Sequence, residues 1–237
     1  MNLALLKRIG AAAAAVILAT SAHAFPLLRI SDSTVTVSLS DGSTADSDSR
    51  TGALAYSHQF GAFDIGRVTG TSAPILGSPT QQVMQLDLLD LTSRGTGGTL
   101  TFEYSIIDLG PATDLFPQLQ VQVATDGTVE YSVYADPGNT IFARTMLLGS
   151  FDFTTGTFSE FEQSLVGITD STYSLTQVIT VHHGAGVRTT SAGASVSGST
   201  AVPAPGMPYL LTGGLLVLGL ARARRPSGRA SNLVGWA

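Results

Sequence analysis

Three aspartates in one short segment offer the kind of oxygen ligands that a calcium ion binds. Asp41, Asp46 and Asp48 lie in a stretch rich in glycine and serine, and Ca²⁺ accepts hard carboxylate oxygens from a pliable loop. Their spacing matches no EF-hand, and aspartate and serine also favour turns through local hydrogen bonds. We prefer the turn interpretation and keep calcium at these three residues as the one candidate cofactor.

Two adjacent histidines raise the possibility of a zinc site. His182 and His183 end a predicted strand, where successive side chains point to opposite faces, so the pair is poorly placed to bind one ion together. His58 can join one of them, but a zinc site needs a further ligand. We therefore predict no histidine metal site.

Glu160 and Glu162 are the best candidates for an acid/base pair. They are two residues apart on a predicted strand and so share a face, whereas the two carboxylates of a glycosidase flank the scissile bond from opposite sides. A solvent-exposed strand face opposite Phe161 explains them better. The chain also lacks a Gly-x-Ser-x-Gly elbow, a phosphate loop and an HExxH motif. We assign no catalytic residue and expect a protein that is not an enzyme.

Tyrosines are the aromatic residues best suited to stack on sugars. Most of them fall where strand alternation predicts core packing, and only one alternates outward, Tyr134. A carbohydrate platform therefore stays an open alternative. The tyrosines considered are Tyr56, Tyr104, Tyr131, Tyr134 and Tyr173.

The elements that must position these residues are strands, because apolar residues recur mostly at period two between Phe25 and His183. We expect hairpins at Asp126-Gly127, a pair suited to a type I′ turn, and at Thr155-Gly156. Eight or more short strands predict an all-β fold, an antiparallel β-sandwich or jelly roll. The clearest runs are Val35, Val37 and Leu39; Leu100, Phe102, Tyr104 and Ile106; and Tyr173, Leu175, Ile179 and Val181.

Charge and composition narrow the function. The 237 residues carry a formal net charge of −5, the sole lysine is Lys7 near the start, and nearly all acidic residues lie between the two ends. This acidic middle argues against nucleic acid as a partner. The chain has no cysteine, which excludes disulfides, thiolate metal sites and a cysteine nucleophile.

The amino-terminal segment 1–24 has the order of a secretory signal peptide. Basic residues precede a short apolar stretch, which ends in Ala22-His23-Ala24 before Phe25. That order predicts handling by the Sec translocon and cleavage by signal peptidase after Ala24. The protein is therefore expected to be exported.

The carboxy-terminal end has five parts. Segment 184–201 is almost wholly Gly, Ala, Ser, Thr and Val, so we predict a flexible stalk that follows a domain spanning 25–183. Residues 202–206 form a rigid extended peptide, and residues 209–221 form an apolar helix of marginal length for a membrane. The arginines at 222–225 place the extension 226–237 in the cytoplasm.

This tail resembles the PEP-CTERM sorting signal of Gram-negative bacteria. Val202, Pro203, Ala204, Pro205 and Gly206 match the recognition peptide, with Ala204 where the family has glutamate, and Arg222, Arg224 and Arg225 match the basic stop. The resemblance covers 202–225 and implies processing by an exosortase-like membrane protease. It also implies transient insertion in the inner membrane, then delivery to the cell surface or extracellular matrix, with a link to exopolysaccharide and biofilm.

The middle resembles uncharacterised β-rich domains found ahead of such tails, through 74–79, Leu86-Asp87-Leu88 and 98–102. That resemblance implies a sandwich and brings no catalytic residues. Two functions follow as expectations. The first is a non-enzymatic surface or matrix protein associated with exopolysaccharide. The alternative is a secreted carbohydrate-binding or carbohydrate-active β-sandwich module.

Overall fold

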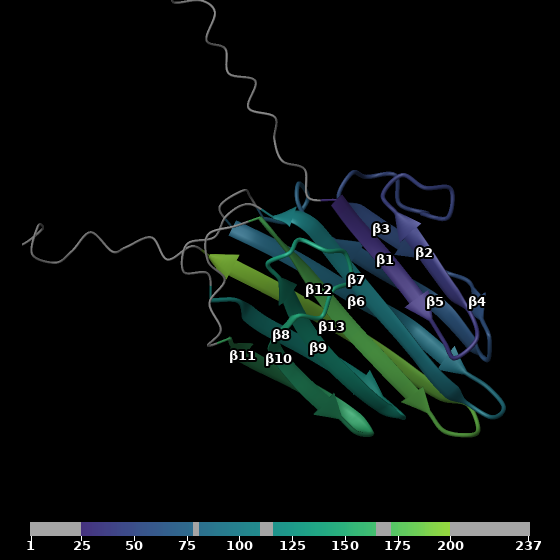
Figure 1. Ribbon diagram of the computed structural model, residues 1–237. Coiled ribbons are helices and arrows are strands. Elements are labelled where there is room, and N and C mark those ends of the chain that lie inside the picture. The colour runs from purple at the N-terminus through teal and green to yellow at the C-terminus, as the bar shows by residue number, and fades with distance from the viewer. Residues whose placement is uncertain (1–24, 78–80, 110–115, 165–171, 200–237) are drawn as a thin grey trace, which may run out of the picture. The chain divides into compact units, whose positions relative to one another are not determined.

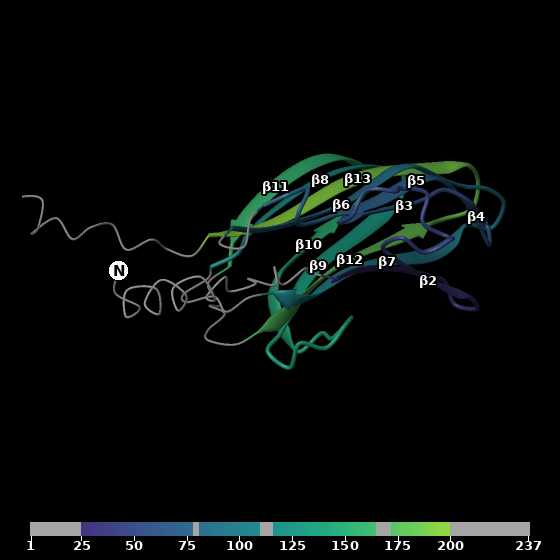
Figure 2. The ribbon, with the colours of Figure 1, turned by 90° about the horizontal axis from the view of Figure 1, so that it is seen from above.

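The computed structural model describes residues 25–77, 81–109, 116–164 and 172–199. In this part of the chain all regular structure is β-strand, arranged as two antiparallel sheets that pack face to face (Figures 1 and 2). The predicted all-β antiparallel sandwich is confirmed for these residues. No helix among them is long and apolar enough to cross a membrane.

The predicted signal peptide, sorting peptide, membrane helix and basic stop lie outside the described residues. Phe25, the residue after the predicted cleavage point, is the first residue of strand β1.

Sheet A has six strands and sheet B has seven. The order in sheet A is β10 (Met146–Phe153), β9 (Thr128–Asp136), β12 (Tyr173–His183), β7 (Gly98–Leu109), β1 (Phe25–Ser31) and β2 (Thr36–Ser40). The order in sheet B is β11 (Gly156–Gln163), β8 (Gln118–Thr125), β13 (Arg188–Ser199), β6 (Gln81–Ser93), β5 (Phe63–Thr71) and β3 (Ala53–Tyr56), with β4 (Gln59–Phe60) paired to β5.

Most short connections cross from one sheet to the other. The strand pairs β6–β7, β8–β9, β10–β11 and β12–β13 are each consecutive in the chain, yet their members lie at matching places in opposite sheets. The predicted hairpins at Asp126-Gly127 and Thr155-Gly156 are therefore wrong, because the flanking strands do not pair with each other. Alternation reports which side of a strand is buried, but it does not report which strand lies beside it.

Gly127 illustrates the difference. A type I′ turn requires a positive φ at this position, and the φ of Gly127 is not positive. Instead, a Cβ at this position would lie 2.2 Å from the carbonyl oxygen of His182. The glycine is needed because the crossing passes close to the end of β12.

The core is the space between the sheets, and the predicted inward faces are confirmed for the central strands. On β7, Leu100, Phe102, Tyr104 and Ile106 are all buried. Burying such side chains contributes roughly 1.5–3 kcal/mol each. The predicted run Val35, Val37 and Leu39 follows the pattern only in part. Leu39 on the edge strand β2 is buried, whereas Val35, which precedes this strand, is 51% exposed.

Two polar residues of β12 tie the sheets together inside this core. Gln177 accepts a hydrogen bond from the Tyr131 hydroxyl at 2.9 Å and donates one to the backbone oxygen of Met84 in sheet B at 3.1 Å. His183 hydrogen-bonds with Ser93 at 2.7 Å and with Thr190 at 2.8 Å, both in sheet B. These bonds satisfy polar groups whose burial would otherwise be costly.

The predicted stalk is the largest correction, because residues 188–199 form β13, a central strand of sheet B. Its inward residues are buried although they are small: Thr190, Ala192, Ala194 and Val196. The segment lacks large apolar residues, so composition suggested disorder. A strand between two neighbours needs only alternation and backbone hydrogen bonds on both sides, and β13 has both, with β6 and β8.

Candidate functional site

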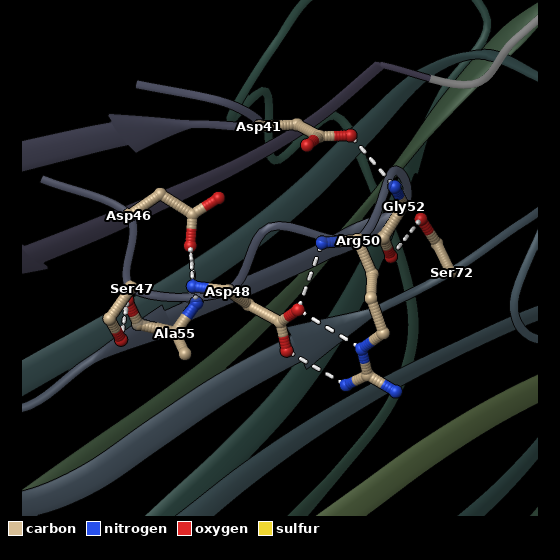
Figure 3. A network of polar contacts seen from close by, with 8 residues as sticks. All are labelled: Asp41, Asp46, Ser47, Asp48, Arg50, Gly52, Ala55 and Ser72. Carbon is tan, nitrogen blue, oxygen red and sulfur yellow. Dashed lines mark hydrogen bonds and ion pairs between the residues drawn. The ribbon is translucent and has the colours of Figure 1, made fainter. Parts of the chain in front are cut away.

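The calcium candidates form a network of turns around Arg50 and Gly52 (Figure 3). Asp46 accepts backbone hydrogen bonds from Asp48 and Ala55, each at 2.9 Å. Asp41 accepts one from Gly52 at 2.7 Å. Asp48 also accepts a backbone hydrogen bond, from Arg50, so calcium would have to displace backbone N–H groups from all three carboxylates.

The carboxylate of Asp48 is bound by Arg50. This carboxylate accepts from the Arg50 backbone and from two guanidinium nitrogens, at 3.0, 3.0 and 2.8 Å. The side-chain hydrogen bonds from Arg50 lower the pKa of Asp48 to about 2. Within the described residues no group of three His, Asp or Glu side chains could hold a metal ion. The turn interpretation explains the geometry of this segment.

The two histidines point to opposite faces, as predicted. His183 faces the core, and burial lowers its pKa. His182 faces outward, with Nδ1 at 2.8 Å from the Thr99 hydroxyl and Nε2 at 3.3 Å from Glu130. His58 packs edge-on against the Tyr56 ring. His58, His182 and His183 therefore do not share a site in the structure.

Glu160 and Glu162 lie on β11, an edge strand of sheet B, on the side opposite Phe161. Both are exposed, but they pair with the buried residues Val121 and Leu119 of β8 and so lie on the core-facing side of this edge strand. The prediction that they form the solvent face of the strand is therefore wrong in its side, because Phe161 is the outward residue. Phe161 is 63% exposed.

The tyrosine prediction is confirmed in its orientation. Four of the five are buried, Tyr56, Tyr104, Tyr131 and Tyr173. Tyr134 faces outward on β9 and is only partly buried. The Arg144 guanidinium lies 5.8 Å from its ring centre.

Sequence reasoning missed a shallow hollow of ≈ 540 Å³ on the outer face of sheet B. It lies over β13 and reaches β6, β8 and β11. Its lining comprises Asp87, Leu88, Leu89, Gln122, Val123, Ala124, Thr157, Phe158, Ser159, Ser191, Ala192 and Gly193.

Strand register shows how the hollow is built. Gly193 pairs with Asp87 on one side and with Gln122 on the other, and Gln122 pairs with Ser159. These four residues thus form one row across four strands, spanning roughly 14 Å at the usual strand spacing. Gly193 has no side chain at the centre of the row, so the hollow exists because β13 carries only small outward residues.

Asp87 is the titratable residue of this row. It is half-buried, and burial raises its pKa, although a hydrogen bond from Gln85 opposes the shift. The Gln85 amide nitrogen lies 2.8 and 3.1 Å from the two carboxylate oxygens. A Cβ at position 193 would lie 3.0 Å from one of those oxygens. The carboxylate therefore lies directly beside the empty floor of the hollow.

A second hollow of ≈ 590 Å³ lies at the end of the sandwich where the crossing connections gather. Its lining is mostly threonine and glycine, with His182 and His183. His182 and His183 already have hydrogen-bond partners. The hollow on sheet B differs in combining a carboxylate, a free amide and an exposed leucine.

No known protein-family profile matches the chain, and no curated protein matches it. Among solved structures, the chain is similar to TmCBM61 in complex with β-1,4-galactotriose. The identity is 6%, over 54% of this chain and 85% of that one, with a TM-score of 0.31. It is also similar to a carbohydrate-binding module, CBM36, in complex with calcium and xylotriose, with 16% identity over 44% of this chain and 76% of that one, and a TM-score of 0.20.

A third similar structure is an arabinose-bound α-L-arabinofuranosidase, MgGH51, with 12% identity and a TM-score of 0.30. The match covers 67% of this chain and only 25% of the enzyme. With identities and TM-scores this low, none of the three structures assigns a ligand, a metal or an activity to this chain.

Proposed function

We propose that this chain is a carbohydrate-binding β-sandwich and that the hollow over Gly193 binds a glycan. Of the two functions expected from the sequence, this is the alternative one. The observation that carries it is the half-buried Asp87 carboxylate beside the side-chain-free floor at Gly193. A carboxylate with a raised pKa in a hollow is a functional-site candidate, because its burial costs stability.

The chemistry of the row suits a sugar. A sugar presents hydroxyl groups around its rim and C–H groups on its faces. Asp87 can accept hydrogen bonds from hydroxyls, and the Gln122 amide can both donate and accept. Leu89, which is 51% exposed, and Ala124 offer apolar contact beside them. Polar groups placed to bond hydroxyls in an otherwise apolar hollow supply both affinity and specificity.

The test compares binding to neutral polysaccharides between the full-length chain and two variants. Galactan, xylan and β-glucan are each cast into native gels, and the retardation of the protein is measured. Asp87→Ala removes the acceptor, and Gly193→Ala fills the floor. Each is expected to weaken binding about tenfold or more, the effect of losing one good polar contact.

Gly184→Ala is the matched control, since a Cβ there meets no atom within 4 Å. It should bind like the unchanged chain. The proposal is wrong if none of the three polymers retards the protein, or if Gly193→Ala and Gly184→Ala bind equally well.

Export, exosortase-like sorting and association with exopolysaccharide stay proposals that rest on the two ends of the sequence. The absence of enzymatic activity also stays a proposal, and it rests on the missing catalytic motifs. A glycan-binding domain is compatible with a place in an extracellular matrix. The intact mass of the protein from its host tests the sorting proposal. A species that begins at Phe25 and ends within 202–206 supports it, and one that retains Arg222 to Ala237 contradicts it.

A further inference from the structure

The outer face of sheet A holds a buried carboxylate where strand alternation predicts an exposed one. Glu103 on β7 is 3% exposed. Arg29 on β1 donates from Nε to one carboxylate oxygen, and Arg144 donates from Nη2 to the other at 2.7 Å. Burial would raise the pKa of Glu103, but the hydrogen bonds from the two arginines outweigh it and the pKa is lowered.

Arg144 arrives on segment 137–145, which joins β9 to β10 and lies over this outer face (Figure 2). The Phe142 backbone N–H donates to the Ser105 hydroxyl at 3.1 Å, and the Ser174 hydroxyl donates to the Thr140 carbonyl at 2.8 Å. These bonds fix the segment against β7 and β12. Asp136, the other buried carboxylate on this face, is bound by Thr140 and Thr145 and by neither arginine.

Phe142 has a φ of 57°, which is unusual and costly for an aromatic residue. This conformation is accompanied by a specific contact, because the Arg29 guanidinium lies 4.2 Å from the Phe142 ring centre. Backbone strain of this kind concentrates at ligand sites, where the surrounding structure maintains it. Here it accompanies the ring that lies against one of the two guanidinium groups.

The two arginines exceed what Glu103 needs. One positive charge would neutralise the carboxylate, and the second leaves a net positive charge in an acidic protein. The side chains of Arg29 and Arg144 are 33% and 46% exposed. Each guanidinium has five N–H donors, and within the described part of the chain each has Glu103 as its one acceptor. Most of their N–H donors therefore have no acceptor within the described part of the chain.

An apolar patch lies next to Arg144. Tyr134 pairs with Leu147 on β10, and Leu147 is 48% exposed. The Tyr134 ring centre also lies 5.8 Å from the Arg144 guanidinium. The face thus combines an anion-binding pair of guanidinium groups with an aromatic and an aliphatic surface.

We propose that Arg29 and Arg144 bind the carboxylate of an acidic sugar, a uronate residue within a polysaccharide, while Tyr134 and Leu147 contact its ring. Guanidinium groups bind carboxylates through paired, charge-assisted hydrogen bonds. The adjacent apolar patch favours a sugar over a free inorganic anion, which would use the arginines alone. The choice of a glycan rests on the proposed function, but this site lies on the other sheet from the hollow over Gly193.

The test uses polygalacturonate and the same polymer with its carboxyl groups methyl-esterified, each titrated into the full-length chain by calorimetry. We expect the acidic polymer to bind at least tenfold more tightly than the ester. Arg144→Gln and Arg29→Lys should each weaken binding of the acidic polymer about tenfold. Arg67→Gln, an exposed arginine on sheet B, is the matched control and should leave that binding unchanged.

Equal affinity for polymer and ester overturns the proposal, and so does an equal loss in Arg144→Gln and Arg67→Gln, which would indicate non-specific attraction. Full competition by millimolar phosphate would assign the site to a free anion instead. Circular dichroism confirms that each variant is folded. Gly193→Ala separates the two proposals, because it should weaken binding of neutral glycans and leave binding of the acidic polymer intact.

Discussion

The outer faces of the two sheets have similar patterns of polar residues but form different surfaces. Both carry short polar residues at alternate positions, yet sheet A is covered by segment 137–145 and buries a carboxylate between two arginines. Sheet B carries a half-buried carboxylate beside an uncovered hollow. The difference shows that the function of a strand face depends on what crosses it and on how small its central residues are.

The two carboxylates, Glu103 on sheet A and Asp87 on sheet B, have opposite effects on the stability of the fold. Glu103 has ionic partners that lower its pKa, whereas Asp87 has an amide partner and a raised pKa. The charged form of Glu103 therefore stabilises the fold, and the charged form of Asp87 destabilises it. A residue that costs stability is the better candidate for binding a ligand.

The sharpest way to break this comparison is to remove both arginines. Arg29→Ala combined with Arg144→Ala leaves Glu103 buried without a counter-charge, and we expect the free energy of unfolding to fall by about 3 kcal/mol. Urea denaturation measures it. Asp87→Asn, the matched change on sheet B, should cause no loss. A fall of less than about 1 kcal/mol in the double variant would mean that the cluster is solvated.

Measuring the free energy of unfolding as a function of pH tests directly whether the charged forms of Glu103 and Asp87 have opposite effects on stability. Glu103→Gln should lower the free energy of unfolding by about 2 kcal/mol at neutral pH, the value of charge-assisted hydrogen bonds. The difference from the unchanged chain should vanish as the pH falls below the ordinary glutamate pKa of 4.5 and through the lowered pKa of folded Glu103. Asp87→Asn should instead match or exceed the unchanged chain at neutral pH.

For Asp87→Asn, any gain should disappear on acidification, because protonation of Asp87 through its raised pKa relieves the same cost. Thermal unfolding followed from pH 7 downward distinguishes the two variants. If both variants were less stable than the unchanged chain at neutral pH, or both more stable, the contrast between the two faces would be wrong.

His183 lies in the core between the two sheets and adds a pH dependence of its own to the stability. Its pKa is lowered from 6.5, chiefly by burial, so its contribution to stability is complete above that value and is lost as the pH falls below it. His183→Leu leaves Ser93 without its partner and should cost about 1 to 2 kcal/mol at neutral pH. It should also remove this part of the pH dependence. An unchanged slope below pH 6.5 would assign that slope to other groups.

The smallest effect is expected at the acidic segment beside β3. Asp46→Asn weakens the backbone hydrogen bonds that the carboxylate accepts from Gly42, Asp48 and Ala55 and should cost about 1 kcal/mol or less. Addition of calcium should leave the melting temperature of the unchanged chain where it is. A calcium-dependent rise that Asp46→Asn abolishes would instead establish the calcium site that the sequence suggested.

Much of the strand content was predictable, because buried alternation on β7 and β12 is carried by large apolar residues. The outward position of Tyr134 and the opposite directions of His182 and His183 follow from the same alternation. Sheet membership was not predictable, since the Asp126-Gly127 crossing has the composition of a hairpin.

The proposed glycan site was missed for a related reason. Its floor lies on β13, whose alanines, serines and glycines were interpreted as a flexible stalk. The alternation of Ala192, Ala194 and Val196 with polar residues was the available signal. The burial of Glu103 was also hidden, because it depends on segment 137–145, which is distant in the sequence.

The most direct test of the central claim is a crystal structure of the chain with an oligosaccharide of the neutral polymer that retards it most. The sugar should lie over Gly193, with a hydroxyl within hydrogen-bond distance of Asp87 and a ring face against Leu89. A sugar at the crossing end beside His182, with the outer face of sheet B empty, would contradict the proposed function.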